Sequence, residues 1–185
     1  LRLAGSYMAT SRLPRTLQPT LNRLAAQTQA AFSAVVRDGD ECVIVARRAG
    51  VAEPVRHLAY GLHLGARLPA HATSTGRVLL ASLPKTEFAA WLKGRELARI
   101  TPQTEVNATR FKALIAKVRL DDHCLARDGH ELGIHALAVP LRNMQGQTLA
   151  ALNVVGTAEQ LSDSAVQRQW LPLLLEAARE MRPLL

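Results

Sequence analysis

Two hydroxyl side chains and a glycine follow one another where a helix is predicted to begin. In the run Thr-Ser-Thr-Gly at 73–76, Thr73 or Ser74 is a typical N-cap residue for a helix that continues through the apolar residues 78–80. Backbone N–H groups at a helix start lack intrahelical partners, and the helix dipole adds partial positive charge there. The run therefore fits a small carboxylate. It fits equally well a plain helix cap in which Gly76 allows close packing.

Patterns that would indicate an enzyme or a metal site are weak. Ser82 and Lys85 have the spacing of an SxxK nucleophile, but Pro84 lies between them at a predicted helix end, and no SDN or KTG partner occurs. The sequence has no GxSxG, P-loop or GxGxxG motif. His123 and Cys124 are adjacent and point to different sides of a helix, and no His or Cys spacing resembles a closed zinc site. We expect no catalytic residue, no metal and no cofactor.

Composition narrows the classes of function. The chain has 185 residues, of which 48% are hydrophobic and 4% aromatic, with a formal net charge of +8. This composition indicates one domain with an aliphatic core and disfavours nucleic-acid binding by base stacking. The 23 Lys and Arg residues are spread along the chain rather than clustered, which also disfavours direct DNA binding. Two cysteines without a CxxC pair, and no apolar run of membrane-spanning length, favour a cytoplasmic protein without a membrane partner.

Hydrophobic periodicity predicts helices alternating with strand pairs. A helix is expected around residues 17–24, beginning near Pro19 or kinked there. Two β-rich runs, 32–37 and 42–47, flank an Asp-Gly turn and predict a hairpin.

The later elements complete the predicted fold class. A short extended segment is expected between His57 and Leu64, and the order of elements indicates an α+β fold with an antiparallel sheet packed against helices. The remaining predicted elements are helices from about 73, over 85–92 and over 109–126, strands over 134–142 and 148–155 around a turn, and a final helix from Ser162 that is kinked at Pro172.

Two blocks of the sequence resemble the effector-binding domain of IclR-family transcription regulators. Residues 65–81, G-A-R-L-P-A-H-A-T-S-T-G-R-V-L-L-A, are similar to the family pattern G-x-R-L-P-x-H-A-T-x-x-G-[KR]-x-L-L-A. Residues 132–141, L-G-I-H-A-L-A-V-P-L, resemble the family's G-[LI]-x-x-[IL]-A-V-P strand. The likeness covers nearly the whole chain. It implies a GAF-like fold, an antiparallel sheet flanked by helices with a ligand pocket on one side.

The resemblance also implies a domain organisation. Residues 1–12 would be the tail of a linker helix to a winged helix-turn-helix domain that the sequence does not contain, and residues 13–185 would be the effector-binding domain. Operator DNA would be bound only by that N-terminal domain, in a homodimer or a tetramer. A ligand that binds one arrangement of the domain better would shift the spacing of the DNA-binding domains.

Carried over position by position, the resemblance assigns an effector site. The effector would lie against the start of the helix that follows the His-Ala-Thr motif, with a wall from the segment before the motif and a floor from the last two strands. The residues assigned in this way are Ser74, Thr75, Leu68, His57, Tyr60, Ala136, Asn153 and Val155.

The sequence departs from the family pattern before Glu131, where acidic residues are common in the family. These positions read Arg127, Asp128 and Gly129 here. If Arg127 turns inward, it favours an anionic ligand. If it turns outward, it is an ordinary surface arginine, and this second reading is favoured because arginines are mostly exposed.

The motif variant indicates a ligand class and leaves alternatives open. The run A-T-S-x-G-R-V-L-L-A, together with Asn153, is similar to the branch of the family that controls aromatic-acid catabolism, so an aromatic or dicarboxylic acid is expected as the small-molecule partner. One alternative is a GAF-like module that binds a nucleotide or another cofactor. Others are a small enzyme with His71 or His57 as its base, and nucleic-acid binding through the basic surface.

Overall fold

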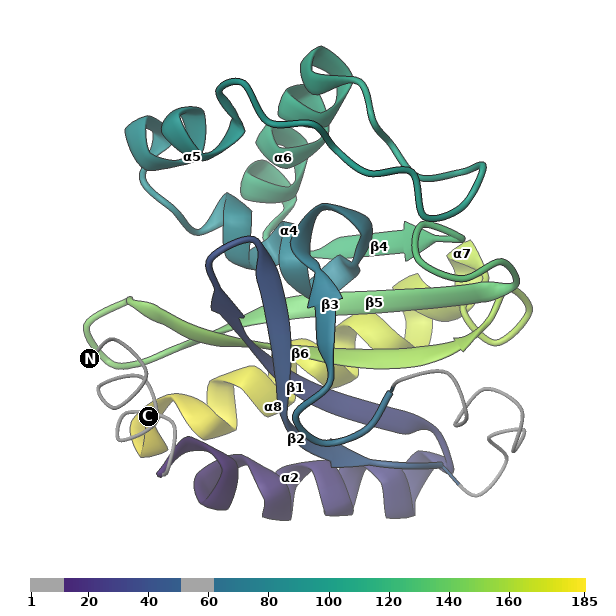
Figure 1. Cartoon of the computed structure of the whole chain (residues 1–185). Helices are drawn as coiled ribbons and strands as arrows, with labels where there is room; N and C mark the ends of the chain where they lie inside the picture. The colour runs from purple at the N-terminus through teal and green to yellow at the C-terminus, as the bar shows by residue number, and fades with distance from the viewer. Residues whose placement is uncertain (1–11, 51–61) are drawn as a thin grey trace.

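A six-stranded antiparallel sheet forms the centre of the molecule, with helices on both faces (Figure 1). The structure is a computed structural model that describes residues 12–50 and 62–185. The strand order is β3-β2-β1-β6-β5-β4. The predicted α+β fold, an antiparallel sheet flanked by helices, is confirmed.

Helices and strands alternate along the chain much as the periodicity predicts. The elements are α2 (Leu13–Thr28), β1 (Ala31–Asp38), β2 (Glu41–Arg48), β3 (Arg67–Pro69), the 3₁₀ turn η1 (Ala70–Ala72), α4 (Ser74–Ala81), α5 (Lys85–Leu92), α6 (Ala108–Asp121), β4 (Cys124–Arg127), β5 (Ile134–Arg142), β6 (Thr148–Thr157), α7 (Asp163–Ala165), the π-helical turn η2 (Val166–Trp170), α8 (Leu171–Met181) and η3 (Arg182–Leu184).

Both predicted hairpins are present, and they meet in the middle of the sheet. Strands β1 and β2 are joined at the Asp-Gly turn, where Gly39 has a φ of +63°, a conformation that glycine adopts readily. Strands β5 and β6 are joined at the turn that contains Gly146. Strand β1 also pairs with β6, which places Ser33 opposite Asn153 although the two lie in different hairpins.

Two hydrophobic cores lie on opposite faces of the sheet. Helices α2 and α8 cover one face, where Leu21, Phe32 and Trp170 are packed, and Figure 1 shows both helices on the same side of the sheet. Helices α4, α5 and α6 lie on the other side, where Leu80 and Phe111 are fully buried. Burying one such side chain contributes about 1.5–3 kcal/mol, so these contacts hold the helices to the sheet.

The helix predicted over 109–126 is shorter than expected. It ends at Asp121, because Asp122 adopts the left-handed conformation with a φ of +58° and stops helical hydrogen bonding. The following residues form the edge strand β4, in which the buried Cys124 and Ala126 alternate with more exposed neighbours. Strand β3 was not predicted either, because three residues are too few for a period-2 pattern.

Prolines lie inside both the first and the last helix. Helix α2 begins at Leu13 rather than near Pro19, with Pro14 in its first turn and Pro19 inside it. In the last helix, Pro172 lies inside a helical run that continues from α7 through α8, and the π-helical turn Val166–Trp170 lies directly before it.

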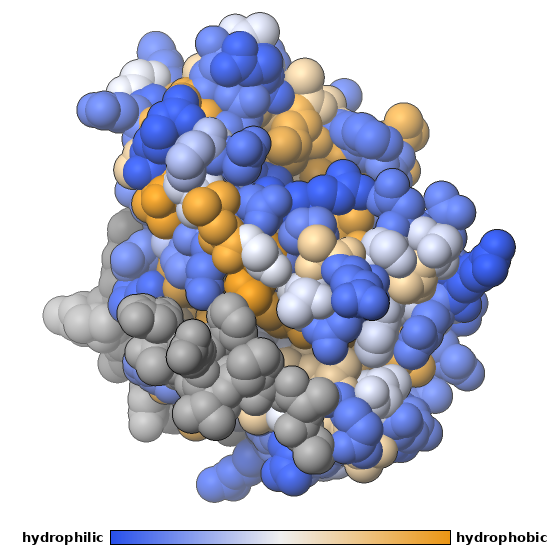
Figure 2. Space-filling view, turned by 90° about the vertical axis from the view of Figure 1, so that its right-hand side faces the viewer, coloured by the Kyte–Doolittle hydropathy of each residue, from blue (hydrophilic) through white to orange (hydrophobic). Residues whose placement is uncertain are grey.

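The surface of the described residues carries apolar side chains singly or in narrow strips. Figure 2 shows apolar side chains as a strip bordered by polar ones. The exposed large apolar residues, Leu120 and Met144 among them, come from several different elements. Such scatter is normal for a folded domain. No helix in the described part of the chain has the length and apolar character needed to cross a membrane.

Candidate functional site

A cavity of about 60 Å³ lies between the start of α4 and the sheet. Its floor comes from alternate residues of neighbouring strands. Asn153 and Val155 share one face of β6, and the residues paired with them are Ser33 in β1 and Ala136 in β5. Of the eight residues predicted for the effector site, six line this cavity: Leu68, Ser74, Thr75, Ala136, Asn153 and Val155. His57 and Tyr60 lie outside the described residues, as do residues 1–11 of the predicted linker tail.

The residues of the Thr-Ser-Thr-Gly run have different structural roles at the start of α4. Thr73 is the N-cap, because its Oγ1 accepts a hydrogen bond from the Gly76 amide at 3.2 Å. The same hydroxyl donates to the carbonyl oxygen of Pro69 at 3.2 Å and so ties the helix to β3. Gly76 packs against the backbone of Ala70, since a Cβ built there would lie 2.1 Å from the Ala70 oxygen. Thr73 therefore caps the helix and Gly76 allows the close packing, and the Ser74 hydroxyl is needed for neither.

Ser74 carries a buried hydroxyl without a partner. Its side chain is 1% exposed, and its Oγ has no hydrogen-bond partner among the described residues. Leaving such a group unpaired costs about 1–3 kcal/mol. The hydroxyl lies in the first turn of α4, where the amides of Ser74 and Thr75 have no intrahelical acceptor. An anion in the cavity would satisfy these donors.

Asn153 presents a second set of donors. Its Oδ1 accepts a hydrogen bond from the backbone amide of Ser33 at 3.1 Å, which fixes which end of the side-chain amide is oxygen. No hydrogen bond of its Nδ2 is found among the described residues, so both N–H groups remain for an occupant of the cavity. The side chain is only 8% exposed, which makes such a bond well shielded from water.

A buried arginine adds positive charge beside the cavity. Arg77 is 6% exposed and forms no ion pair within the described residues. Its Nε donates to the carbonyl oxygen of His71 at 2.9 Å. Its Nη2 lies against Gly129, a residue of the cavity wall, at 3.4 Å from a Cβ built there. Since a charge in a low-dielectric site is weakly screened, Arg77 stabilises negative charge nearby.

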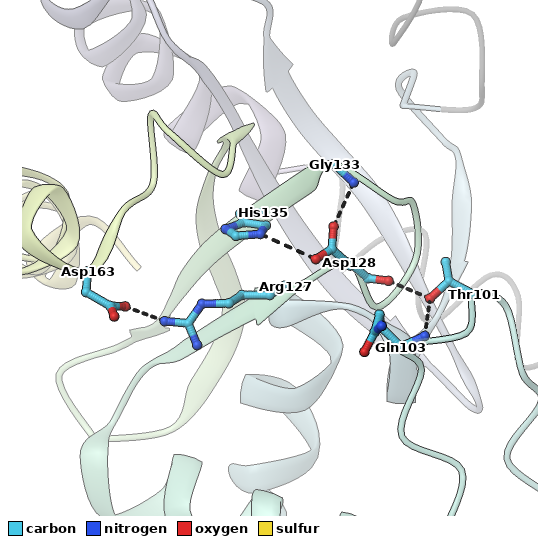
Figure 3. A network of polar contacts seen from close by, with 7 residues as sticks. All are labelled: Thr101, Gln103, Arg127, Asp128, Gly133, His135 and Asp163. Atoms are coloured by element: carbon cyan, nitrogen blue, oxygen red, sulfur yellow. Dashed lines mark hydrogen bonds and ion pairs between the residues drawn. The ribbon is translucent and has the colours of Figure 1, made fainter.

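The loop that carries one wall of the cavity is held by the polar contacts in Figure 3. Asp128 has a φ of +56°, and its Oδ1 accepts the Gly133 amide at 2.6 Å. Its carbonyl oxygen accepts the Thr101 hydroxyl at 2.5 Å, and Nε2 of His135 lies 3.6 Å from its Oδ2. These contacts fix the loop just before His130.

Arg127 turns away from the cavity. It pairs with Asp163 on the surface, and its side chain is 51% exposed. The outward orientation favoured for the Arg127 side chain is therefore confirmed, and the inward orientation is wrong. The positive charge beside the cavity comes from Arg77 instead.

Several residues of the cavity wall were missed by the sequence analysis. Ser33 is a polar residue within the otherwise apolar run 31–36 of β1, and that irregularity was an available signal. His130 and Glu131 also line the cavity, but loop residues before a strand carry no periodic signal. Burial lowers the pKa of His130 below its ordinary value, so its ring is neutral at pH 7.

His71, the candidate base that lies within the described residues, has a structural role. His71 does not line the cavity, and its Nε2 hydrogen-bonds the carbonyl oxygen of Ala98 at 2.7 Å. Its ring also packs edge-on against Phe111. Burial raises the pKa of the Cys42 thiol to about 12 and raises that of Cys124 as well, so neither is a thiolate at neutral pH.

Comparisons with known proteins agree with the resemblance. A family model described as bacterial transcriptional regulator IclR C-terminal matches residues 5–182. The chain is 42% identical over 185 residues to the Pca operon regulatory protein of Acinetobacter baylyi, and 43% identical over 185 residues to the p-hydroxybenzoate hydroxylase transcriptional activator of the same organism. Both matches cover 100% of this chain, and they cover 66% and 68% of these relatives. The chain thus spans about two thirds of their length.

A solved structure is similar as well. It is the inducer-binding domain of a double mutant of the PobR transcription factor from Acinetobacter, in complex with 3-hydroxybenzoic acid. The match has a TM-score of 0.85 at 44% sequence identity and covers 93% of this chain and 98% of that one.

Proposed function

This chain belongs to the IclR family of bacterial transcriptional regulators, as an effector-binding domain, and we propose that its effector is a small aromatic acid bound in the cavity at the start of α4. The relatives are named as regulators and an activator of transcription. The prediction that the chain is not an enzyme is thereby confirmed, and so is its likeness to the aromatic-acid branch of the family.

The observation that carries the proposal is the unpaired Ser74 hydroxyl at a helix start. A carboxylate accepts hydrogen bonds from such a hydroxyl and from the amides beside it. Arg77 supplies the compensating charge without touching the cavity itself. Val35, Ile44 and Leu68 line the same cavity and offer apolar surface to a ring.

The PobR domain supports the choice of acid. That domain is 44% identical to this chain, and its structure holds 3-hydroxybenzoic acid. The Asn153 amide would donate a hydrogen bond to a ring hydroxyl oxygen or to the carboxylate. A carboxylate, one ring and one further acceptor together define a hydroxybenzoate-like effector.

The effector would act on DNA through linkage. If it binds one arrangement of a dimer or tetramer better than another, it shifts the population toward that arrangement and changes the spacing of attached DNA-binding domains. The largest shift possible equals the difference in affinity of the acid for the two arrangements.

The alternative of a nucleotide or another phosphate-bearing cofactor has less support. The described lining of the cavity contains no Lys or Arg side chain that could contact a phosphate group directly. A single carboxylate needs no such contact, because hydroxyl and amide donors suffice for it.

A thermal-shift screen of the chain tests the proposal. Benzoate, 3-hydroxybenzoate, 4-hydroxybenzoate, protocatechuate and β-ketoadipate would be compared, with AMP as the nucleotide probe. At 100 times its dissociation constant, an acid stabilises the fold by about 2.7 kcal/mol, which raises Tm by several degrees. We expect a shift with at least one hydroxybenzoate and none with AMP.

Matched serine variants locate the site. Ser74→Ala is expected to remove most of the shift, whereas Ser164→Ala, at an exposed position, should keep it. A shift that survives in Ser74→Ala would place the acid elsewhere. No shift with any of the acids would refute the aromatic-acid proposal.

A further inference from the structure

A second, larger cavity lies next to the first. Its volume is about 120 Å³, and it lies where α2 ends and β6 leads into the segment before α7. Its apolar lining includes Val154, Leu161 and Trp170. Of the six effector-site residues that the structure describes, only Val155 belongs to it, and Val155 lines both cavities.

Four polar side chains in this lining are hydrogen-bonded within the protein, and Glu131 also belongs to the lining. Thr28 Oγ1, Gln29 Nε2 and Trp170 Nε1 donate to backbone carbonyl oxygens at 2.8, 3.1 and 2.8 Å. Gln160 Oε1 accepts the amide of Thr157 at 2.9 Å. These groups need nothing from a ligand, in contrast to Ser74 in the first cavity. An occupant would therefore gain mainly from apolar contact, and burying an unpaired charge there would be strongly unfavourable.

An aromatic side chain in the wall narrows the class of occupant further. Trp170 lies in the lining of the second cavity, and aromatic rings pack well against an indole, so a single aromatic ring suits the chemistry of this lining.

We propose that the second cavity is a binding site for an uncharged aromatic ring molecule, separate from the site of the acid. The two cavities share Leu62, Glu131, Ile134 and Val155, so the two ligands would lie on either side of one wall.

The two tryptophans of the chain allow a direct test. Trp91→Phe removes the one that does not line the cavity and leaves Trp170 as the only tryptophan. Titration of this variant with toluene, a neutral single ring, is expected to change the Trp170 emission saturably and to raise Tm. The absence of any saturable change would overturn the proposal.

Filling the cavity provides the matched control. Ala30 lines the second cavity but not the first, and Ala30→Leu in the Trp91→Phe background is expected to weaken toluene binding at least tenfold. Ala26→Leu makes the same change at an exposed position of α2 and should leave binding unchanged. Equal toluene binding by both variants would refute the site. If Ala30→Leu fails to fold, Val154→Ala enlarges the cavity and is expected to shift the preference from toluene to p-xylene.

Competition separates this proposal from the proposed function. Toluene binding is expected to persist in Ser74→Ala and in the presence of saturating 3-hydroxybenzoate. If 3-hydroxybenzoate competes with toluene for one site, the second site does not exist as proposed, while the acid site stands. If toluene binds and no acid does, the proposed effector is wrong and the second cavity stands.

Discussion

The side-chain oxygen of Asn153 accepts a hydrogen bond from the backbone amide of Ser33, 3.1 Å away across the pair β1–β6. Replacing Asn153 by Asp keeps an acceptor for Ser33 but turns the donor end into a charged oxygen. We expect Asn153→Asp to weaken binding of an aromatic acid at least tenfold, because like charges then meet in a buried cavity. Isothermal titration calorimetry with 3-hydroxybenzoate measures this effect.

An exposed asparagine provides the control for that variant. Asn22 lies on the surface of α2, and Asn22→Asp adds the same charge away from the cavity. It should bind the acid like the unchanged chain. If Asn153→Asp binds within twofold of Asn22→Asp, the side-chain amide does not contact the acid.

Thr73 caps helix α4, and the contribution of this cap to the free energy of unfolding should be measurable. Thr73→Ala removes the acceptor of the Gly76 amide and the donor to Pro69, and is expected to lower the free energy of unfolding by about 1 kcal/mol. Thr73→Ser keeps the hydroxyl and should lose less than half of that. Urea denaturation compares them, and an equal loss in both variants would contradict the role of the cap.

Gly76 tolerates no side chain because of the backbone it contacts. A Cβ at this position would lie 2.1 Å from the Ala70 oxygen, and neither backbone can move without shifting α4 from the sheet. We expect Gly76→Ala to lose about 3 kcal/mol or more of stability, or to fail to fold. Gly94→Ala has nothing within 4 Å and bears only the strain of a φ of +66°, about 1–2 kcal/mol. A Tm for Gly76→Ala above that of Gly94→Ala would be the contrary result.

Thr104 is expected to stabilise the cavity wall through its hydrogen bond to Gly129. Its buried hydroxyl accepts the amides of Ile100 and Thr101 at 3.2 and 2.8 Å and donates to the Gly129 oxygen at 2.7 Å. Thr104→Val leaves these groups unpaired and should cost about 2 kcal/mol in urea unfolding. It should also weaken acid binding, since Gly129 lines the cavity. Thr109→Val, at an exposed position, serves as the control, and equal stability of the two variants would disprove the role.

Two histidines should make stability depend on pH below neutrality. Burial lowers the pKa of His71 and of His130 below the ordinary value of 6.5. Between each folded pKa and 6.5 the unfolded chain binds more protons, so the free energy of unfolding rises with pH there and falls as pH drops below 6.5. Urea midpoints from pH 8 to pH 5 should show this fall. His71→Gln should reduce it, while His63→Gln, at an exposed site, should not.

The local features of this protein were predictable from its sequence because they depend on neighbours in the chain. An Asp-Gly turn between β-rich runs predicts its hairpin, and the Thr-Ser-Thr-Gly run predicts a helix start, since both involve only a few consecutive residues. The resemblance carried by the two motif blocks likewise indicated the family, and four residues within these blocks, Leu68, Ser74, Thr75 and Ala136, now share one cavity.

Tertiary structure decided which of those residues are free to bind. Only packing shows that Thr73 caps the helix, that Gly76 contacts Ala70, and that the Ser74 hydroxyl has no partner among the described residues. Strand β4 replaces the end of a predicted helix because Asp122 turns left-handed and the next residues find an edge of the sheet. The pairing of Ser33 with Asn153 joins residues 120 positions apart, and strand register, which no local pattern encodes, brings them together.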